Sequence, residues 1–175
     1  MLKKITRSDM SHLDALTEFY DKVTARLEAT VNYPKWTRGV YPGRESITKA
    51  IESGIQYICT VDGKTVGAFI LNKDPQGNYG AGEWEKEVSE GEYMVIHTLA
   101  VSPDCARQGI GQAMIKFALE RAKAEGCKAV RLDVVPDNIP ARKLYEKAGF
   151  TFAGEKDLDR NIPEIPLFAL YELNF

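Results

Sequence analysis

A glycine-containing turn near residue 110 is the part of the sequence whose residue types and spacing most clearly predict chemistry. Gly109 and Gly111 stand in residues 102–114, which read SPDCARQGIGQAM. An apolar, β-prone run at 93–101 precedes them, and apolar residues recur at helical spacing after them. Glycines let the main chain approach an anion closely, while the first N–H groups and the dipole of a helix point toward it. The pattern therefore predicts a phosphate-binding turn between a strand and a helix.

Two common nucleotide-binding motifs do not match this turn. A dinucleotide site has G-x-G-x-x-G after the first strand and an acidic residue roughly 20 residues later. Here the glycines come past the middle of the chain, and position 114 is Met. A P-loop has Lys and then Ser or Thr after its glycines, whereas Gln112 and Ala113 follow here. Both nucleotide sites are excluded on residue type.

The bulk properties are those of a globular chain. With 175 residues, we expect one domain over 1–175. A net charge of −2 and the absence of a basic stripe argue against a nucleic-acid surface. No apolar run reaches the length of a membrane span, and the N-terminus lacks an apolar signal segment, so we expect no membrane contact. Cys59, Cys105 and Cys127 show no metal-ligand spacing, which predicts reduced thiols, no metal and a cytoplasmic location.

The elements that must position the turn follow from periodicity and breakers. We expect a strand at 2–5 and a helix whose apolar face runs over 13–27 and whose start is signalled by Ser8 or Ser11. A second helix is expected from Ser46. Runs at 55–61 and 65–71 form a hairpin. After the glycine-turn helix come a strand at 129–135, a helix that begins at Asn138, and strands at 151–154 and 167–173. This order predicts an α/β fold with a mixed central sheet and helices on both faces.

Two long irregular stretches interrupt these elements. Residues 30–43 contain Trp36, and residues 72–91 are rich in glycine and acidic residues around Trp84. Loops of this length inside a compact domain are usually functional or mobile. The alternative is that the two tryptophans only cover the core from outside.

Two linked motifs resemble a known family. Leu99-Ala100-Val101-x-Pro103 is followed by Arg107-Gln108-Gly109-Ile110-Gly111, and then by Asn138-x-x-Ala141-x-x-Leu144-Tyr145-x-x-x-Gly149-Phe150. Together they are similar to the GCN5-related N-acetyltransferase (GNAT) superfamily over roughly residues 92–152. The resemblance implies that family's mostly antiparallel central sheet and an enzyme that uses acetyl-coenzyme A (acetyl-CoA).

The resemblance also assigns the cofactor contacts. The backbone of residues 107–112 would bind the pyrophosphate; these are Arg107, Gln108, Gly109, Ile110, Gly111 and Gln112. The strand edge of Leu99, Ala100 and Val101 would pair with the pantetheine amides. Asn138 would contact the far end of the pantetheine arm. The family usually has Arg or Gln where this chain has Ala106, so one side-chain phosphate contact is expected to be missing, with Arg107 as a possible substitute.

Acetyl transfer to an amine needs a base that titrates near neutrality. His97 fits by residue type, and the resemblance places it where family members carry a base; a histidine satisfied within the sheet is the alternative. Asp133 is a rival base, although an ion pair with Arg131 on the same strand face is the favoured interpretation. Glu92 or a water molecule are further alternatives. Tyr145 matches the family tyrosine that donates a proton to the coenzyme A sulfur and also contacts the cofactor, the alternative being simple packing.

The sequence therefore predicts an N-acetyltransferase that moves an acetyl group directly from acetyl-CoA to a primary amine, in a small molecule or a protein. The alternative is a module of the same fold that senses acyl-CoA without turnover. A homodimer is possible, since the family often forms one.

Overall fold

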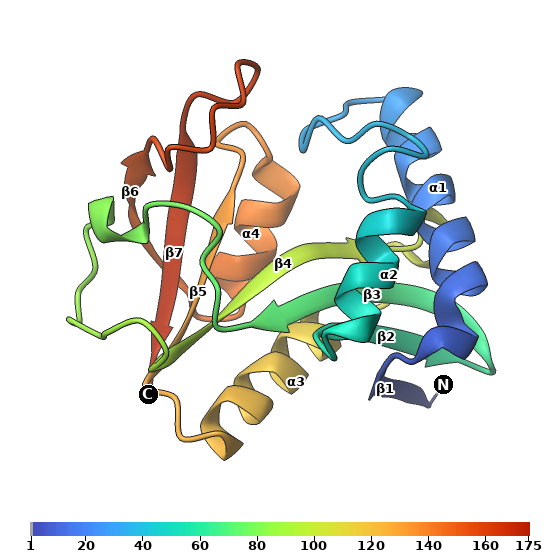
Figure 1. The fold of residues 1–175 in the computed structure, drawn as a ribbon, viewed down its shortest axis with the longest axis horizontal. Helices are drawn as coiled ribbons and strands as arrows, with labels where there is room; N and C mark the ends of the chain where they lie inside the picture. Colours follow the sequence, from blue (N-terminus) through green and yellow to red (C-terminus); the bar gives the residue numbers. More distant parts are fainter. Residues whose placement is uncertain (1) are drawn as a thin grey trace. The chain divides into compact units, whose positions relative to one another are not determined.

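A computed structural model describes residues 2–175 and contains the predicted succession of elements (Figure 1). The strands are β1 (Lys3–Arg7), β2 (Gln56–Val61), β3 (Lys64–Asn72), β4 (Tyr93–Val101), β5 (Ala129–Val134), β6 (Thr151–Lys156) and β7 (Phe168–Asn174). The α-helices are α1 (Leu13–Glu28), α2 (Arg44–Glu52), α3 (Ile110–Ala124) and α4 (Ile139–Lys147). Short 3₁₀ turns are η1 (Met10–His12), η2 (Tyr79–Ala81) and η3 (Pro103–Cys105). The order of strands and α-helices predicted from the sequence is confirmed.

The strands form a mixed, mostly antiparallel sheet, as predicted. Hydrogen bonding orders them β1-β2-β3-β4-β5-β7-β6. β4 and β5 pair in parallel, while β1 with β2, β2 with β3, β5 with β7 and β6 with β7 are antiparallel. The chain divides into two compact units, which we describe separately: unit 1 holds residues 2–71 and Thr98–Phe117, and unit 2 holds Asn72–His97 and Ala118–Phe175.

In unit 1, helices cover both faces of the β2–β3 hairpin. Ile58 and its cross-strand partner Ala68 belong to the apolar core that contains the buried residues of α1 and α2. The neighbouring pair, Tyr57 and Phe69, stacks at 5.3 Å, and both rings contact Phe117 of α3. Because successive strand residues point to opposite faces, α3 lies on the face opposite to α1 and α2. The prediction of helices on both faces is confirmed here.

The helix starts in unit 1 differ from those predicted. Neither Ser8 nor Ser11 caps α1; instead the Asp9 side chain accepts hydrogen bonds at η1, the short turn that leads into the helix. The second helix begins at Arg44 rather than at Ser46. The Ser46 hydroxyl accepts a hydrogen bond from the N–H of Gly43 at 3.0 Å, so Ser46 acts from inside the first turn. Both errors come from assigning a capping side chain to the wrong position of the first turn.

Unit 2 has a core of its own, built on β4, β5 and β7. Tyr93, Val95 and Leu170 are among its buried members, and Trp84 packs against them. In unit 1, Trp36 packs against the core in the same partly buried way. Both tryptophans therefore cover a core, which was the alternative interpretation of the two long loops.

None of the helices within residues 2–175 has the length and apolarity that crossing a membrane requires.

Candidate functional site

The glycine turn lies in unit 1, between β4 and α3. Arg107 and Gly109 have φ angles of +62° and +69°, so the main chain enters the left-handed region twice. The first hydrogen bond of α3 runs from the N–H of Ala113 to the carbonyl of Gly109, at 3.1 Å. The N–H groups of Ile110 and Gly111 come before this bond, where helical N–H groups point out of the N-terminus toward any anion. These main-chain donors are suited to a phosphate anion, which is the group that the motif resemblance predicts here.

Close packing of α3 on β3 fixes the position of this turn within unit 1. A Cβ atom at Gly67 would lie 2.8 Å from Sδ of Met114 and 3.1 Å from Cγ2 of Ile110. Both side chains are fully buried. Glycine at position 67 therefore allows the first turns of α3 to rest directly on the β3 backbone.

Lys3 is a residue near the glycine turn that the sequence did not reveal. Its Nζ lies 3.4 Å from the position that a Cβ at Gly109 would occupy. A lysine ammonium is a point charge suited to phosphate, and Ala106 leaves this turn without the usual side-chain contact. Lys3 is on β1, far away in sequence and outside every motif, so no local signal pointed to it.

β4 changes its backbone conformation at Thr98, immediately after His97. The φ angle of Thr98 is +47°, which a β-branched residue rarely adopts. Its carbonyl accepts a hydrogen bond from the Tyr20 hydroxyl at 2.9 Å, and burial raises the pKa of Tyr20, which keeps the phenol a donor. Simple strand alternation would put His97 on the same face as Leu99 and Val101, and the positive φ of Thr98 interrupts that alternation.

His97 lies in unit 2 with its ring almost fully buried. Its Nε2 is 3.0 Å from Oδ1 of Asn72 and 2.9 Å from the carbonyl oxygen of Asp74. The N–H of Asp74 donates to the same Asn72 oxygen at 3.1 Å, which identifies that atom as an acceptor. Because both neighbours of Nε2 are acceptors, Nε2 carries the proton and the lone pair of the neutral ring is on Nδ1.

The electrostatic surroundings keep this ring neutral at pH 7. Burial lowers the pKa of His97 below its ordinary value of 6.5, while the charge of Asp133 opposes that change only in part. A neutral imidazole with its lone pair on Nδ1 is a competent proton acceptor at neutral pH. His97 is thus both hydrogen-bonded in the sheet and chemically basic, so the two interpretations of this residue do not exclude each other.

Asp133 lies in an ion pair, but its partner is Arg160 rather than the expected Arg131. Arg160 Nη1 and Nη2 donate to the two carboxylate oxygens at 2.8 and 2.7 Å, and the Tyr79 hydroxyl donates to Oδ2 at 2.6 Å. Arg160 stands in the connection between β6 and β7, where no motif marks it. The three donated hydrogen bonds give Asp133 a structural pairing rather than the free carboxylate of a base.

Arg131 pairs instead with Glu172 of β7, at 3.8 Å, and both side chains are buried. Its guanidinium lies 4.1 Å from the ring centre of Trp84 and 4.5 Å from that of Tyr93. The prediction of an Arg131–Asp133 pair assumed that partners share a strand. The antiparallel register puts Glu172 directly opposite Arg131 and so supplies the partner from β7.

The two predicted cofactor residues of α4 lie at its start and in its last turn. Asn138 caps the helix, with Oδ1 accepting from the N–H of Ala141 at 3.2 Å, so its amide N–H₂ is the group directed to other partners. The Tyr145 ring is buried against Phe150 and Tyr171, with distances between ring centres of 6.0 and 6.4 Å. Burial raises the pKa of Tyr145 well above its ordinary value, so the phenol stays protonated at pH 7.

Glu92 is poorly suited to act as the base. Its carboxylate pairs with Lys128 at 2.5 Å and is substantially exposed. The hydrogen bond from Lys128 lowers the pKa of Glu92 below its ordinary value, which weakens it as a proton acceptor. The ion pair with Lys128 thus argues against Glu92 as the base.

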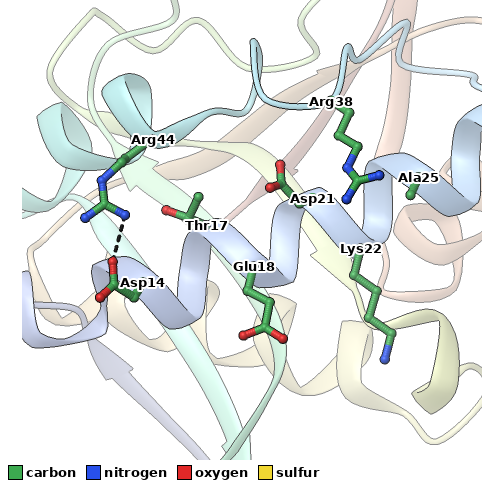
Figure 2. Close-up of a pocket in the computed structure, with 8 residues that line it drawn as sticks. All are labelled: Asp14, Thr17, Glu18, Asp21, Lys22, Ala25, Arg38 and Arg44. Carbon is green, nitrogen blue, oxygen red and sulfur yellow. Dashed lines mark hydrogen bonds and ion pairs between the residues drawn. The ribbon is translucent and has the colours of Figure 1, made fainter.

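A surface groove of about 580 Å³ lies elsewhere in unit 1, along α1 (Figure 2). Its walls include three acidic and three basic side chains, and Arg44 pairs with Asp14 across it at 2.7 Å. None of the predicted site residues lines this groove. Its mixed charges favour no particular ligand.

Residues 19–150 match the sequence profile of the acetyltransferase (GNAT) family. The chain belongs to this family. GNAT acetyltransferases use acetyl-CoA as the acetyl donor. The resemblance found in the two motifs is thereby confirmed over most of the chain.

Individual relatives agree with this assignment. An uncharacterised N-acetyltransferase of Methanocaldococcus jannaschii is 29% identical over 150 residues, which are 85% of this GNAT chain and 59% of the relative. A mycothiol acetyltransferase of Clavibacter michiganensis is 36% identical over 82 residues, 47% of this chain and 26% of that protein. The chain thus spans less than two thirds of either relative. A GNAT-family acetyltransferase from Streptococcus agalactiae has the same fold, with a TM-score of 0.81, 18% identity and coverage of 99% and 95% of the two chains.

Proposed function

We propose that this chain is an N-acetyltransferase that moves the acetyl group of acetyl-CoA directly to a primary amine of a small molecule or a protein. We infer one N-acetyltransferase domain over residues 1–175, since the family match at residues 19–150 includes parts of both units. The observation that carries the proposal is the buried His97 ring, whose Nε2 lies between two hydrogen-bond acceptors and whose lone pair we therefore assign to Nδ1.

The glycine turn would bind the pyrophosphate through the backbone of residues 107–112, with Lys3 adding a positive charge. The main chain of Leu99, Ala100 and Val101 would pair with the pantetheine amides, and the Asn138 amide would contact the end of that arm. When bound, acetyl-CoA supplies a thioester whose carbonyl carbon forms the new bond to the amine nitrogen while the carbon–sulfur bond breaks.

His97 Nδ1 would take the proton that the amine nitrogen loses as it becomes an amide. The Tyr145 hydroxyl would give a proton to the departing sulfur, because its raised pKa keeps the phenol protonated. His97 would then return its proton through solvent and Tyr145 would regain one, so that no net proton stays on the enzyme. A strand N–H would polarise the carbonyl, which requires no particular side chain.

Thiol release from acetyl-CoA over a panel of amines tests this function. We expect thiol release with at least one primary amine. The rate of release should fall strongly in His97→Ala and less in Tyr145→Phe. His12→Ala is the matched control, because His12 is the chain's other histidine and lies in the turn before α1.

The same assay discriminates between the N-acetyltransferase and the alternative, an acyl-CoA sensor without turnover. Tight binding of acetyl-CoA without thiol release on any amine would overturn the enzyme and favour an acyl-CoA sensor. If His97→Ala keeps the wild-type pH–rate profile, the assignment of the base is wrong and a water molecule takes its place.

A further inference from the structure

Arg160 links three segments of unit 2 that are far apart in sequence. Its Nε donates to the carbonyl of Gln76 at 2.5 Å, and Nη2 donates to the carbonyl of Pro75 at 3.2 Å. Nη1 and the same Nη2 donate the two hydrogen bonds to the carboxylate of Asp133 on β5. The guanidinium also lies 4.6 Å from the ring centre of Phe168 at the start of β7. One side chain thus joins the loop after β3 to two strands.

The loop that Arg160 contacts is the loop that fixes the His97 ring. Pro75 and Gln76 directly follow Asp74, whose carbonyl oxygen accepts the proton on Nε2 of His97. A displacement of Pro75 and Gln76 would therefore move the Asp74 carbonyl as well. Proline at 75 stiffens this connection because its ring fixes φ.

Other contacts keep the loop near the Arg160 segment without the guanidinium. The N–H of Asn78 donates to the carbonyl of Leu158 at 3.0 Å, and Nδ2 of Asn78 donates to Asp159 at 3.1 Å. A Cβ at Gly77 would lie 2.7 Å from the Leu158 carbonyl oxygen, so the two main chains are in close contact. A variant at position 160 is thus expected to fold, with its effect confined to how the loop orients His97.

We propose that Arg160 is a positioning residue for His97: it holds residues 74–76 so that the Asp74 carbonyl keeps the proton on Nε2 and the basic lone pair on Nδ1. Asp133, which neutralises Arg160 and accepts from Tyr79, belongs to the same arrangement. The proposal rests on the proposed function for its catalytic consequence, but the ring itself can be observed without any substrate.

The charged groups around His97 set the direction of the expected changes. Asp133 from β5 and Asp74 from the loop raise the pKa of His97, and Arg160 lowers it, while burial is the largest influence and also lowers it. Removing the arginine charge leaves Asp133 without its neutralising partner. The pKa of His97 is then expected to rise, and the acidic limb of the rate profile moves to higher pH.

The test is ¹⁵N NMR of the His97 ring in the whole protein, combined with steady-state kinetics. In Arg160→Gln we expect a raised ring pKa, a mixture of the two neutral tautomers, a kcat lower by about tenfold, and an unchanged KM for acetyl-CoA. In Arg160→Lys the charge stays but the fork is lost, so the pKa is expected near that of the wild type while the tautomers still mix. Asp133→Asn added to Arg160→Gln should bring the raised pKa back down.

Arg142→Gln is the matched control for the NMR measurement. Arg142 is similarly shielded, at 23% side-chain exposure against 20% for Arg160, and it also donates to a main-chain carbonyl, that of Pro136, at 3.0 Å. Its polar partners are Tyr171, Pro136 and Glu155 rather than residues 74–76, so in Arg142→Gln the His97 ring is expected to keep its wild-type tautomer and pKa.

A folded Arg160→Gln protein with a wild-type His97 tautomer and pKa would overturn the proposal, whatever its activity. If His97→Ala proves fully active while Arg160→Gln still mixes the tautomers, the positioning role stands and the proposed base is wrong. A change in the KM for acetyl-CoA equal to the change in kcat would show that Arg160 acts on cofactor binding instead, which also overturns the proposal.

Discussion

The glycine turn of unit 1 and the His97 cluster of unit 2 place charge by different physical means. The turn uses main-chain N–H groups at the start of α3 and positive φ angles at Arg107 and Gly109. The cluster uses side chains from separate segments, in which Asn72 and the Asp74 carbonyl contact His97, and Arg160 contacts the same loop. The first arrangement depends on backbone conformation, and the second depends on which segments the fold brings together.

This difference predicts which changes each region tolerates. The N–H donors of a main-chain site do not depend on the side chain at position 106. Ala106 therefore removes one expected side-chain phosphate contact and leaves the N–H groups in place. A side-chain cluster is weakened when any of its members is removed, because each side chain orients the next one.

His97→Ala should lower kcat by about 100-fold, because general base catalysis typically contributes that much or more. The dissociation constant of coenzyme A should stay at its wild-type value, since the ring belongs to the cluster and not to the turn. Thiol-release assays measure kcat, and isothermal titration calorimetry measures the dissociation constant of coenzyme A. Equal losses of kcat and of coenzyme A affinity would contradict the separation of roles between the two regions.

Asp133→Asn should destabilise the protein by about 1.5–3 kcal/mol, because it weakens charged hydrogen bonds from Arg160 at a site with only 10% side-chain exposure. Asp14→Asn is the matched control in unit 1, where the pair with Arg44 is exposed by 87% and 59%. Exposed pairs contribute about 0–1 kcal/mol. Urea unfolding measures both, and similar losses at the two positions would contradict the prediction.

The pH dependence of kcat/KM should report the lowered pKa of His97 in the free enzyme. The ring must be neutral to accept a proton, and burial puts its pKa below 6.5, so kcat/KM should fall as the pH decreases through that lowered value. Above 6.5 this group should impose no loss. The pH–rate profile of the wild type against His97→Ala checks this, and an acidic limb that survives in the variant would assign the limb to another group.

Gly109→Val should raise the dissociation constant of coenzyme A by about tenfold, because a β-branched residue is strained at a φ of +69° and the turn must distort. Gly63→Val is the matched control. Gly63 has a φ of +75° in the β2–β3 hairpin turn and no other atoms within 4 Å of a Cβ there. The control should lose comparable stability and keep its affinity for coenzyme A.

Lys3→Met should weaken coenzyme A binding by about threefold, which is the smallest effect we expect, because a partly exposed ammonium adds little to a main-chain site. The loss should shrink further at high salt. Lys4→Met, the exposed neighbour on the same strand, is the control. Titration calorimetry at two salt concentrations decides the matter, and equal effects at positions 3 and 4 would remove Lys3 from the site.

Some features of the chain follow from local sequence alone. The glycine turn, the Asn138 cap with Pro140 in the first turn of α4, and the β2–β3 hairpin all depend on a few consecutive residues. Asp62 and Gly63 both have positive φ in that hairpin turn, as the Asp-Gly pair predicts. A phosphate-binding turn can also be predicted from local sequence, because the glycine spacing and the start of the helix lie within six residues.

Other features were decided by the tertiary structure. The fold brings together segments that are far apart in sequence, and three pairings depend on this: Arg160 with Asp133, Glu172 with Arg131, and Lys3 with Gly109. The tautomer of His97 belongs here too, since it depends on a carbonyl 23 residues earlier in the chain. Local patterns encode backbone conformation and amphipathic faces, whereas the partner of a buried charge is selected by strand register and loop packing. The sequence therefore predicts where a phosphate would bind, because glycines and a helix start are local, and only the fold decided which groups hydrogen-bond to the His97 ring.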